Sequence, residues 1–170
     1  MSDGITTRPA EVGDAAAIAA IYNAGIRERI ATYETAERSV NERASWLRDH
    51  DPRFPVLVAM QGDAVVGWAG TDAYRPRACY AGVAEFSIYI DPAHRGAGVG
   101  TILLAALIEA SREAGLWKLL SRIFPENAAS RALCQALGFR DVGIYERHAQ
   151  LDGVWRDVVI VERLIPENQA

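Results

Sequence analysis

The chain has 170 residues, of which half are hydrophobic and 24% charged, with 18 Lys and Arg against 22 Asp and Glu. This length predicts a single domain over residues 1–170, and the composition is globular rather than disordered. The net charge of −4 argues against a nucleic-acid partner, which would favour a basic surplus. No apolar run reaches the roughly 18 residues of a membrane span, and two cysteines are too few for a disulfide framework. We therefore expect a soluble, cytoplasmic protein with no membrane partner.

The first half of the chain predicts two helices among short strands. A strand over Ile5–Arg8 ends at Pro9, Asp14 is the expected N-cap of an alanine-rich helix, and a loop follows over Arg27–Thr35. Ser39 and Glu42 form the capping-box pattern that starts a second helix. The other predicted elements of this half are strands over Val56–Met60 and Ala64–Thr71 around a Gln61–Asp63 turn, a polar segment over Tyr74–Tyr80, and a strand over Val83–Ile90.

Helices and strands alternate in the second half. The predicted elements are a helix over Gly98–Ala114, a strand over Lys118–Phe124, a helix over Ala128–Leu137, and strands over Phe139–Glu146 and Val154–Leu164. The complete order, β-α-α-β-β-β-α-β-α-β-β, predicts an α+β fold in which helices cover a mixed sheet.

The segment Arg95–Gly100 is the strongest local indication of function. Its three glycines alternate between a predicted strand and a predicted helix, so backbone N–H groups can turn toward one point near the positive end of the helix dipole. Such a site suits a pyrophosphate. A P-loop is excluded because no Gly-Lys-Ser/Thr follows, and the dinucleotide fingerprint fails because Thr101 stands where it requires glycine. The pattern that remains is R-x-x-G-x-G.

This pattern resembles the pyrophosphate loop of the GNAT family of acetyl-CoA-dependent N-acetyltransferases. The segment Asn127–Phe139 resembles the family's N-x-x-A…G-F helix, and the predicted element order is also that of the family. The resemblance implies the GNAT acyl-CoA N-acyltransferase fold, with a central, mostly antiparallel twisted sheet flanked by helices. It also implies acetyl-CoA as co-substrate, bound by Ile88, Tyr89, Ile90, Arg95, Gly96, Ala97, Gly98, Val99, Gly100, Thr101, Asn127 and Ser130.

Three further segments, Ala31–Thr35, Ala84–Ser87 and Gly153–Val158, resemble the phosphinothricin N-acetyltransferase branch of the family. Within it, the chain looks most like enzymes that acetylate arsinothricin, the arsenic counterpart of phosphinothricin. The resemblance implies acetylation of the α-amine of a small, glutamate-like acidic analogue, which gives resistance to it. It places Tyr33 and Thr35 in the substrate pocket. The branch is commonly homodimeric, which makes the late strand, 154–164, a candidate contact.

Glu85 is the best candidate for the general base. It is the only carboxylate in an otherwise apolar strand, and apolar surroundings would help it to accept the proton of the attacking amine. The resemblance implies the same role. The alternative is a structural carboxylate paired with an arginine. Backbone N–H groups of the Ile88–Ile90 strand are expected to stabilise the oxyanion.

Arg75 and Arg77 are the candidates for selecting an acidic acceptor, because two nearby arginines can bind two acidic groups. If their segment is extended they face opposite sides, and one of them is then only surface charge. Cys134 stands where the family has a tyrosine or histidine that protonates the leaving thiolate; we interpret it as a core residue. The histidines show no metal-ligand spacing, so no metal is expected.

Two other functions stay open at this point. The first is the same chemistry on another amine, such as methionine sulfoximine, a polyamine, an aminoglycoside or a protein N-terminus. The second is a non-catalytic acyl-CoA-binding module, which would keep the Arg95–Gly100 loop but would not need Glu85.

Overall fold

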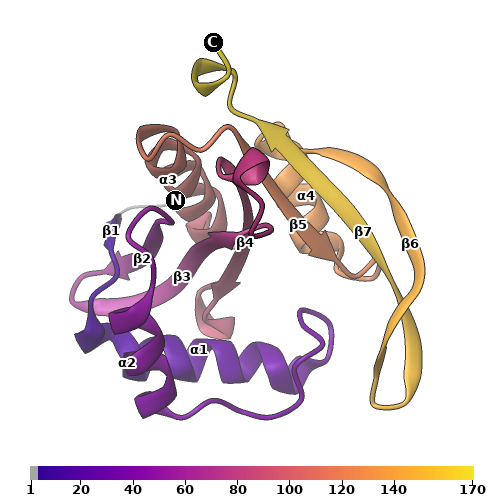
Figure 1. The fold of residues 1–170 in the computed structure, drawn as a ribbon. Coiled ribbons are helices and arrows are strands. Elements are labelled where there is room, and N and C mark those ends of the chain that lie inside the picture. The colour runs from indigo at the N-terminus through magenta and orange to yellow at the C-terminus, as the bar shows by residue number, and fades with distance from the viewer. Residues whose placement is uncertain (1–3) are drawn as a thin grey trace.

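Seven strands form one mixed sheet in the computed structural model, which describes residues 4–170 (Figure 1). From edge to edge their order is β1 (Ile5–Pro9), β2 (Val56–Gln61), β3 (Ala64–Ala73), β4 (Val83–Ile90), β5 (Lys118–Ile123), β7 (Val154–Leu164) and β6 (Arg140–Leu151). Neighbouring strands run antiparallel except for β4 and β5, which are parallel. The predicted α+β fold, with a mostly antiparallel sheet flanked by helices, is confirmed.

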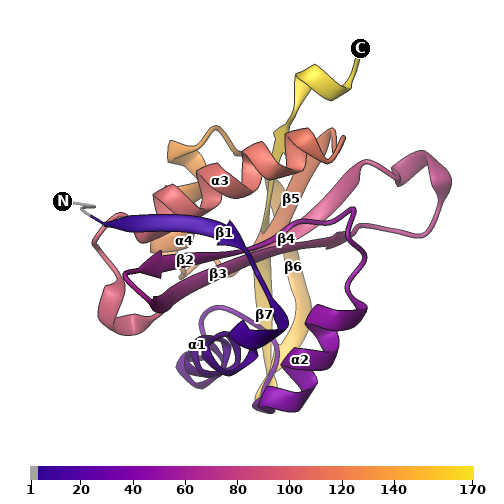
Figure 2. The same cartoon turned by 90° about the vertical axis from the view of Figure 1, so that its left-hand side faces the viewer.

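Helices cover both faces of the sheet (Figure 2). One face carries α1 (Ala15–Glu28) and α2 (Val40–Asp49), and the other carries α3 (Val99–Glu113) and α4 (Ala128–Ala136). Each face has its own apolar core. On the α3 side Leu103 and Leu107 pack with Phe86, and on the α1 side Ile18 packs with Trp68. None of the helices formed by residues 4–170 is long and apolar enough to cross a membrane.

The parallel pair in the middle of the sheet is short. Residues Val83–Glu85 of β4 pair with Lys118–Leu120 of β5, and beyond them the two strands separate (Figure 1). Just past the last pair, the Ser121 hydroxyl donates to the Phe86 carbonyl at 2.9 Å. On its β5 side, the second half of β4 therefore borders an opening in the sheet, while its other side stays paired with β3. This divergence positions the candidate site.

Most predicted elements agree with the structure to within two residues, but Asp14 does not cap α1 as expected. A 3₁₀ turn, Val12–Asp14, precedes the helix, and the Asp14 side chain makes no cap hydrogen bond. Instead its carboxylate accepts hydrogen bonds from the Arg8 guanidinium at 2.8 Å and from the Glu11 N–H at 2.7 Å. The Arg8 contact lowers the pKa of Asp14. In addition, α1 continues to Glu28, past the predicted start of the loop.

The last hairpin is longer than predicted. β6 was expected to end at Glu146, but it continues to Leu151 through an irregularity at Arg147, whose φ is +46°. The Asp157 carboxylate on β7 accepts the Arg147 N–H at 2.7 Å and so stabilises the irregularity. Asp152 and Gly153, with φ of +50° and +79°, form the two-residue turn that this backbone requires. The polar residues around position 147 therefore belong to a bulged strand and do not end it.

Candidate active site

A cavity of about 360 Å³ opens where β4 leaves β5. It is lined by Ile88–Ile90 of β4, by most of the loop from Arg95 to Thr101, and by Asn127 and Ser130 at the start of α4. Of the residues predicted to bind acetyl-CoA, all but Ala97 line this one cavity.

The glycine loop has the backbone conformation that its sequence predicts. Gly96 and Gly98 have φ of +75° and +82°, in the left-handed region that favours glycine, and Gly98 is the N-cap of α3. A Cβ on Gly100 would lie 3.2 Å from the Leu133 side chain, so this glycine lets α3 approach α4 closely. The positive end of the α3 dipole therefore lies in the cavity wall, an arrangement that fits a pyrophosphate.

Two side chains of the predicted cofactor site hold the cavity walls together. The Arg95 guanidinium lies 2.8 Å from a Glu28 carboxylate oxygen at the end of α1. The Asn127 side chain accepts the Ser130 N–H at 3.2 Å as the N-cap of α4, and it donates to the Ile30 carbonyl at 3.3 Å. These contacts join the glycine loop to the end of α1 and the start of α4 to the loop that follows α1.

A second cavity, of about 630 Å³, lies beside the first. Its lining comes from the loop after α1 (31–36) and from Asp72, Glu85, Ser87, Tyr89, Ser121, Arg122 and His148 on four different strands. Tyr89 lines both cavities, and a small space of about 60 Å³ shares walls with each. The two cavities therefore adjoin, as transfer of a group between two bound molecules requires.

Tyr33 and Thr35 both line the second cavity, where the resemblance placed them. The Tyr33 hydroxyl donates to the Arg156 carbonyl at 3.1 Å, and its ring packs edge-on against Phe124 at 4.9 Å. Burial raises the pKa of Tyr33, so this phenol stays neutral and acts as a donor. The loop after α1 is thereby attached to the hairpin strand β7.

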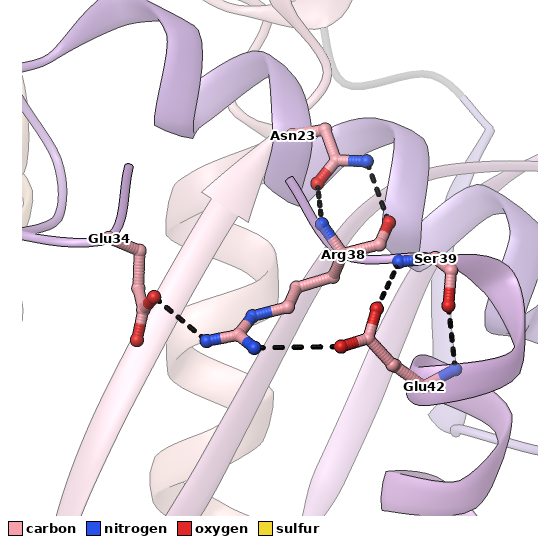
Figure 3. Close-up of polar contacts among 5 residues, drawn as sticks. All are labelled: Asn23, Glu34, Arg38, Ser39 and Glu42. Carbon is pink, nitrogen blue, oxygen red and sulfur yellow. Dashed lines mark hydrogen bonds and ion pairs between the residues drawn. The ribbon is translucent and has the colours of Figure 1, made fainter. Parts of the chain in front are cut away.

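A polar network centred on Arg38 fixes the other end of this loop (Figure 3). The Arg38 guanidinium contacts the Glu34 carboxylate at 2.8 Å and reaches Glu42 on α2 at 3.6 Å. The Arg38 N–H and carbonyl both bond to the Asn23 amide of α1, at 2.8 and 2.9 Å. Ser39 and Glu42 form the predicted capping box at the start of α2. The wall of the second cavity is therefore an ordered part of the fold.

Glu85 lies in the wall of the second cavity, and its carboxylate accepts a hydrogen bond from the Arg122 guanidinium at 2.7 Å. Its side chain is 29% exposed. The expectation that Glu85 has apolar surroundings is wrong, because alternate residues of a strand face opposite sides of the sheet. Ala84 and Phe86 are buried in the α3-side core, whereas Glu85 faces the cavity. The arginine considered as a structural partner is therefore present, and it too lines the cavity.

The sequence of the chain matches that of a known family. Residues 18–139, more than half of the chain, match the model of the Acetyltransferase (GNAT) family. The chain belongs to the GNAT acetyltransferase family. It is 31% identical to the phosphinothricin N-acetyltransferase of Streptomyces coelicolor, with 94% of this chain and 95% of the relative covered. It is 30% identical to the L-methionine sulfoximine/L-methionine sulfone acetyltransferase of Salmonella typhimurium, with 98% of each covered.

The fold of the chain also resembles that of a solved GNAT structure. The crystal structure of a GNAT phosphinothricin acetyltransferase from Sinorhizobium meliloti in complex with acetyl-CoA superposes with a TM-score of 0.88. It is 31% identical, and the match covers 95% of this chain and 88% of that one. The protein is thus an N-acetyltransferase by family, and a structural neighbour binds acetyl-CoA.

Two of the three carboxylates that line the second cavity of this GNAT enzyme are paired with arginines. Besides Glu85, the cavity is lined by Glu34 and Asp72, which sequence reasoning missed. Glu34 pairs with Arg38, and the His50 ring lies 3.7 Å from Asp72. Asp72 and Glu85 are cross-strand neighbours in β3 and β4. The missed residues stand in loops and strand ends, where no local pattern marks them. Arg122, a charge near the end of the predicted strand 118–124, is the missed residue that the sequence alone could have indicated.

Arg75 and Arg77 lie elsewhere. Both are exposed on the connection between β3 and β4, neither lines the second cavity, and the Arg75 guanidinium lies 5.0 Å above the Tyr74 ring. The single chain therefore does not bring them to Glu85. Residues 4–170 contain no cluster of three or more His, Cys, Asp or Glu side chains that could hold a metal ion.

Cys134 is a core residue of α4. Its side chain is almost completely buried in the α3-side core, and burial raises the pKa of the thiol to about 12. A CoA thiol has a pKa of about 8.5, so a donor that holds its proton so tightly is a poor acid for the leaving thiolate. The core interpretation agrees with this burial.

Proposed function

We propose that this enzyme transfers the acetyl group of acetyl-CoA to the α-amine of a small acidic amino-acid analogue of the phosphinothricin or arsinothricin type, giving resistance to it in the cytoplasm. One observation carries the proposal: the Glu85 carboxylate faces the larger cavity next to the glycine-loop cavity, where β4 and β5 diverge. The relatives named for phosphinothricin and methionine sulfoximine support the substrate class.

In this proposal the glycine-loop cavity holds acetyl-CoA. Backbone N–H groups of Gly96–Gly100 and the start of α3 bind the pyrophosphate, and the unpaired edge of β4 at Ile88–Ile90 lies along the pantetheine arm. Asn127 and Ser130, which shape the start of α4, form the opposite wall. The acetyl group is then directed toward the second cavity.

Glu85 supplies the base catalysis. Glu85 takes a proton from the bound ammonium, and the neutral amine nitrogen then forms a bond to the thioester carbonyl carbon. The C–S bond breaks to release CoA thiolate, and the second amine proton leaves to the thiolate or to solvent. N–H groups of β4 stabilise the oxyanion. A thiolate with a pKa of about 8.5 leaves at neutral pH without a strong acid, so the chemistry does not need Cys134. Direct transfer between the adjoining cavities requires no acyl-enzyme.

The charge pattern also bears on the other acceptors. A strongly cationic polyamine would favour an uncompensated acidic cavity, whereas Glu34 and Glu85 are each paired with an arginine. A non-catalytic acyl-CoA-binding module would bind acetyl-CoA and acetylate none of the amines tested.

The decisive test is CoA release from acetyl-CoA by the purified protein, with arsinothricin, phosphinothricin, methionine sulfoximine, glutamate and spermidine compared as acceptors. We expect turnover on the first three well above glutamate and spermidine. Turnover on spermidine alone would overturn the substrate class. Acetyl-CoA binding without turnover on any acceptor would overturn the proposed enzyme function in favour of the binding module.

We also propose that the enzyme is a homodimer that uses the β6–β7 hairpin. β6 is an edge strand, and the hairpin exposes a set of large apolar side chains, Val142, Ile144, Tyr145, Val154 and Trp155, which are 48–62% exposed. Light scattering should give twice the 18.5 kDa of one chain, and Ile144→Lys should reduce it to one. A monomeric mass for the wild type would overturn the dimer.

That Arg75 or Arg77 binds the second acidic group of the acceptor stays a prediction. The Met variant of each arginine tests it, because loss of the binding residue should raise the KM for the acceptor.

A further inference from the structure

We propose that Arg122 binds the α-carboxylate of the acceptor, so that Arg122 and Glu85 together recognise the zwitterion of a free α-amino acid. This inference rests on the function proposed above and deepens it. It assigns a specificity-determining role to a residue outside the motifs that identified the family.

The first argument is position. Glu85 is the last residue of β4 that pairs with β5, and its partner is Leu120. Arg122 lies two residues after Leu120 on β5, where the two strands separate. The ion pair between Arg122 and Glu85, 2.7 Å from Nη2 to Oε1, therefore spans the start of the opening. Arg122 lines both the second cavity and the small space that connects it with the glycine-loop cavity. An acceptor group on Arg122 would lie next to the path of acetyl transfer.

The second argument is availability. The Arg122 side chain is 42% exposed, and its contact with Glu85 uses one of the five N–H donors of a guanidinium. Within residues 4–170, Arg122 is the only arginine that lines the second cavity. Arg38 is engaged by Glu34 and Glu42, and Arg156 by Glu126. Arg122 is thus the cation that can turn free donors toward a ligand.

The third argument is charge complementarity. A free α-amino acid carries its amine and its carboxylate on one carbon, so the two charges are a few ångströms apart. Glu85 and Arg122 present the opposite pair of charges at a similar separation. With the carboxylate on the Arg122 fork, the amine lies against Glu85, the proposed base. Binding and base catalysis then depend on the same pair.

This arrangement predicts selectivity for a free α-carboxylate over an amide. The test compares kcat/KM for L-phosphinothricin and its α-carboxamide in the wild type, Arg122→Lys and Arg122→Met. We expect the wild type to favour the acid about 10–100-fold, the usual range for a hydrogen bond to a charged group. Arg122→Met should lose this preference because the acid alone reacts more slowly, and Arg122→Lys should keep part of it.

Arg131→Met is the matched control, because Arg131 also pairs with a carboxylate on another element, Asp141, at 2.9 Å, and does not line the second cavity. It should keep the wild-type preference. Equal losses for acid and amide in Arg122→Met, with acetyl-CoA affinity unchanged, would show a merely structural role and overturn the inference. A wild type without acid preference would do the same. Failure of the wild type to acetylate either compound would instead overturn the proposed function, and this inference with it.

Discussion

The two adjoining cavities are built in different ways. The glycine-loop cavity is lined mainly by one continuous segment and by backbone, with α3 starting at its wall. The second cavity is lined by side chains from a loop and from strands that are far apart in the sequence. A ligand held by backbone N–H groups needs a particular backbone conformation, which glycine supplies. A ligand held by side chains needs only that several elements meet, which leaves each residue type free to vary.

The two cavities have different tasks in the proposed function. There the loop binds a part of acetyl-CoA that stays the same whichever amine is acetylated. In the same proposal the second cavity distinguishes acceptors, and its charged lining residues Asp72 and Arg122 belong to no local motif. Substitutions in the two cavities should therefore separate co-substrate binding from acceptor chemistry.

The largest expected effect is that of Glu85→Gln. Loss of the base should lower kcat by about 10²- to 10⁴-fold, while the dissociation constant for acetyl-CoA stays nearly unchanged. Steady-state kinetics and calorimetric titration measure the two quantities. Glu34→Gln is the matched control, since Glu34 lines the same cavity and also pairs with an arginine. Equal losses in both variants would contradict the specific role of Glu85.

The next effect concerns the other cavity. Gly98→Ala places a side chain at a φ of +82°, which costs roughly 1–2 kcal/mol and should displace the loop. We expect acetyl-CoA to bind about tenfold more weakly, with kcat at saturation changed little. Gly62→Ala in the β2–β3 turn, at a φ of +58°, introduces similar strain far from both cavities. If Gly62→Ala weakened acetyl-CoA binding as much, the loop would have no special role.

A third substitution tests the wall that the cavities share. A Cβ on Gly25 of α1 would lie 2.9 Å from Cδ1 of Tyr89, a residue that lines both cavities. Gly25→Ala should raise the KM for acetyl-CoA and for the acceptor together, each by several-fold. Overpacking costs typically 1–3 kcal/mol, and the gain in helix propensity, about 1 kcal/mol, offsets part of it. Gly13→Ala, in open space, should change neither KM; a change in only one would show that Tyr89 serves a single cavity.

The smallest effect on turnover is expected for Cys134→Ala, less than about twofold, because the thiol lies in the core rather than in the chemistry. The substitution should instead change how the free energy of unfolding depends on pH. The folded pKa of about 12 lies above the 9.0 of an unperturbed cysteine thiol, so above pH 9 the unfolded state loses this proton first. The free energy of unfolding should then fall by up to about 1.4 kcal/mol per pH unit. Urea unfolding at pH 8.5 and 10 should show this decrease in the wild type and a smaller one in Cys134→Ala. A tenfold loss of kcat would restore the general-acid role.

The sequence by itself determined the local features of this protein. Apolar periodicity predicted β4 at its observed bounds and α3 to within a residue, because a helix or strand repeats over a few positions. The alternating glycines predicted a backbone that turns its N–H groups toward one point, and Gly96 and Gly98 adopt the positive φ that glycine permits. The cofactor side of the site followed from these two kinds of signal.

Only the tertiary structure decided what meets across the sheet. Glu85 and Arg122 form an ion pair because β4 and β5 are parallel neighbours in one register, and 37 positions of sequence separate them. The Tyr33 hydroxyl meets the Arg156 carbonyl 123 positions away, and Arg75 and Arg77 lie outside the cavity that their charge suggested. Spacing along the chain fixes direction only within an element, whereas register and strand divergence fix which side chains share a cavity. The acceptor side of the site is therefore a property of the fold.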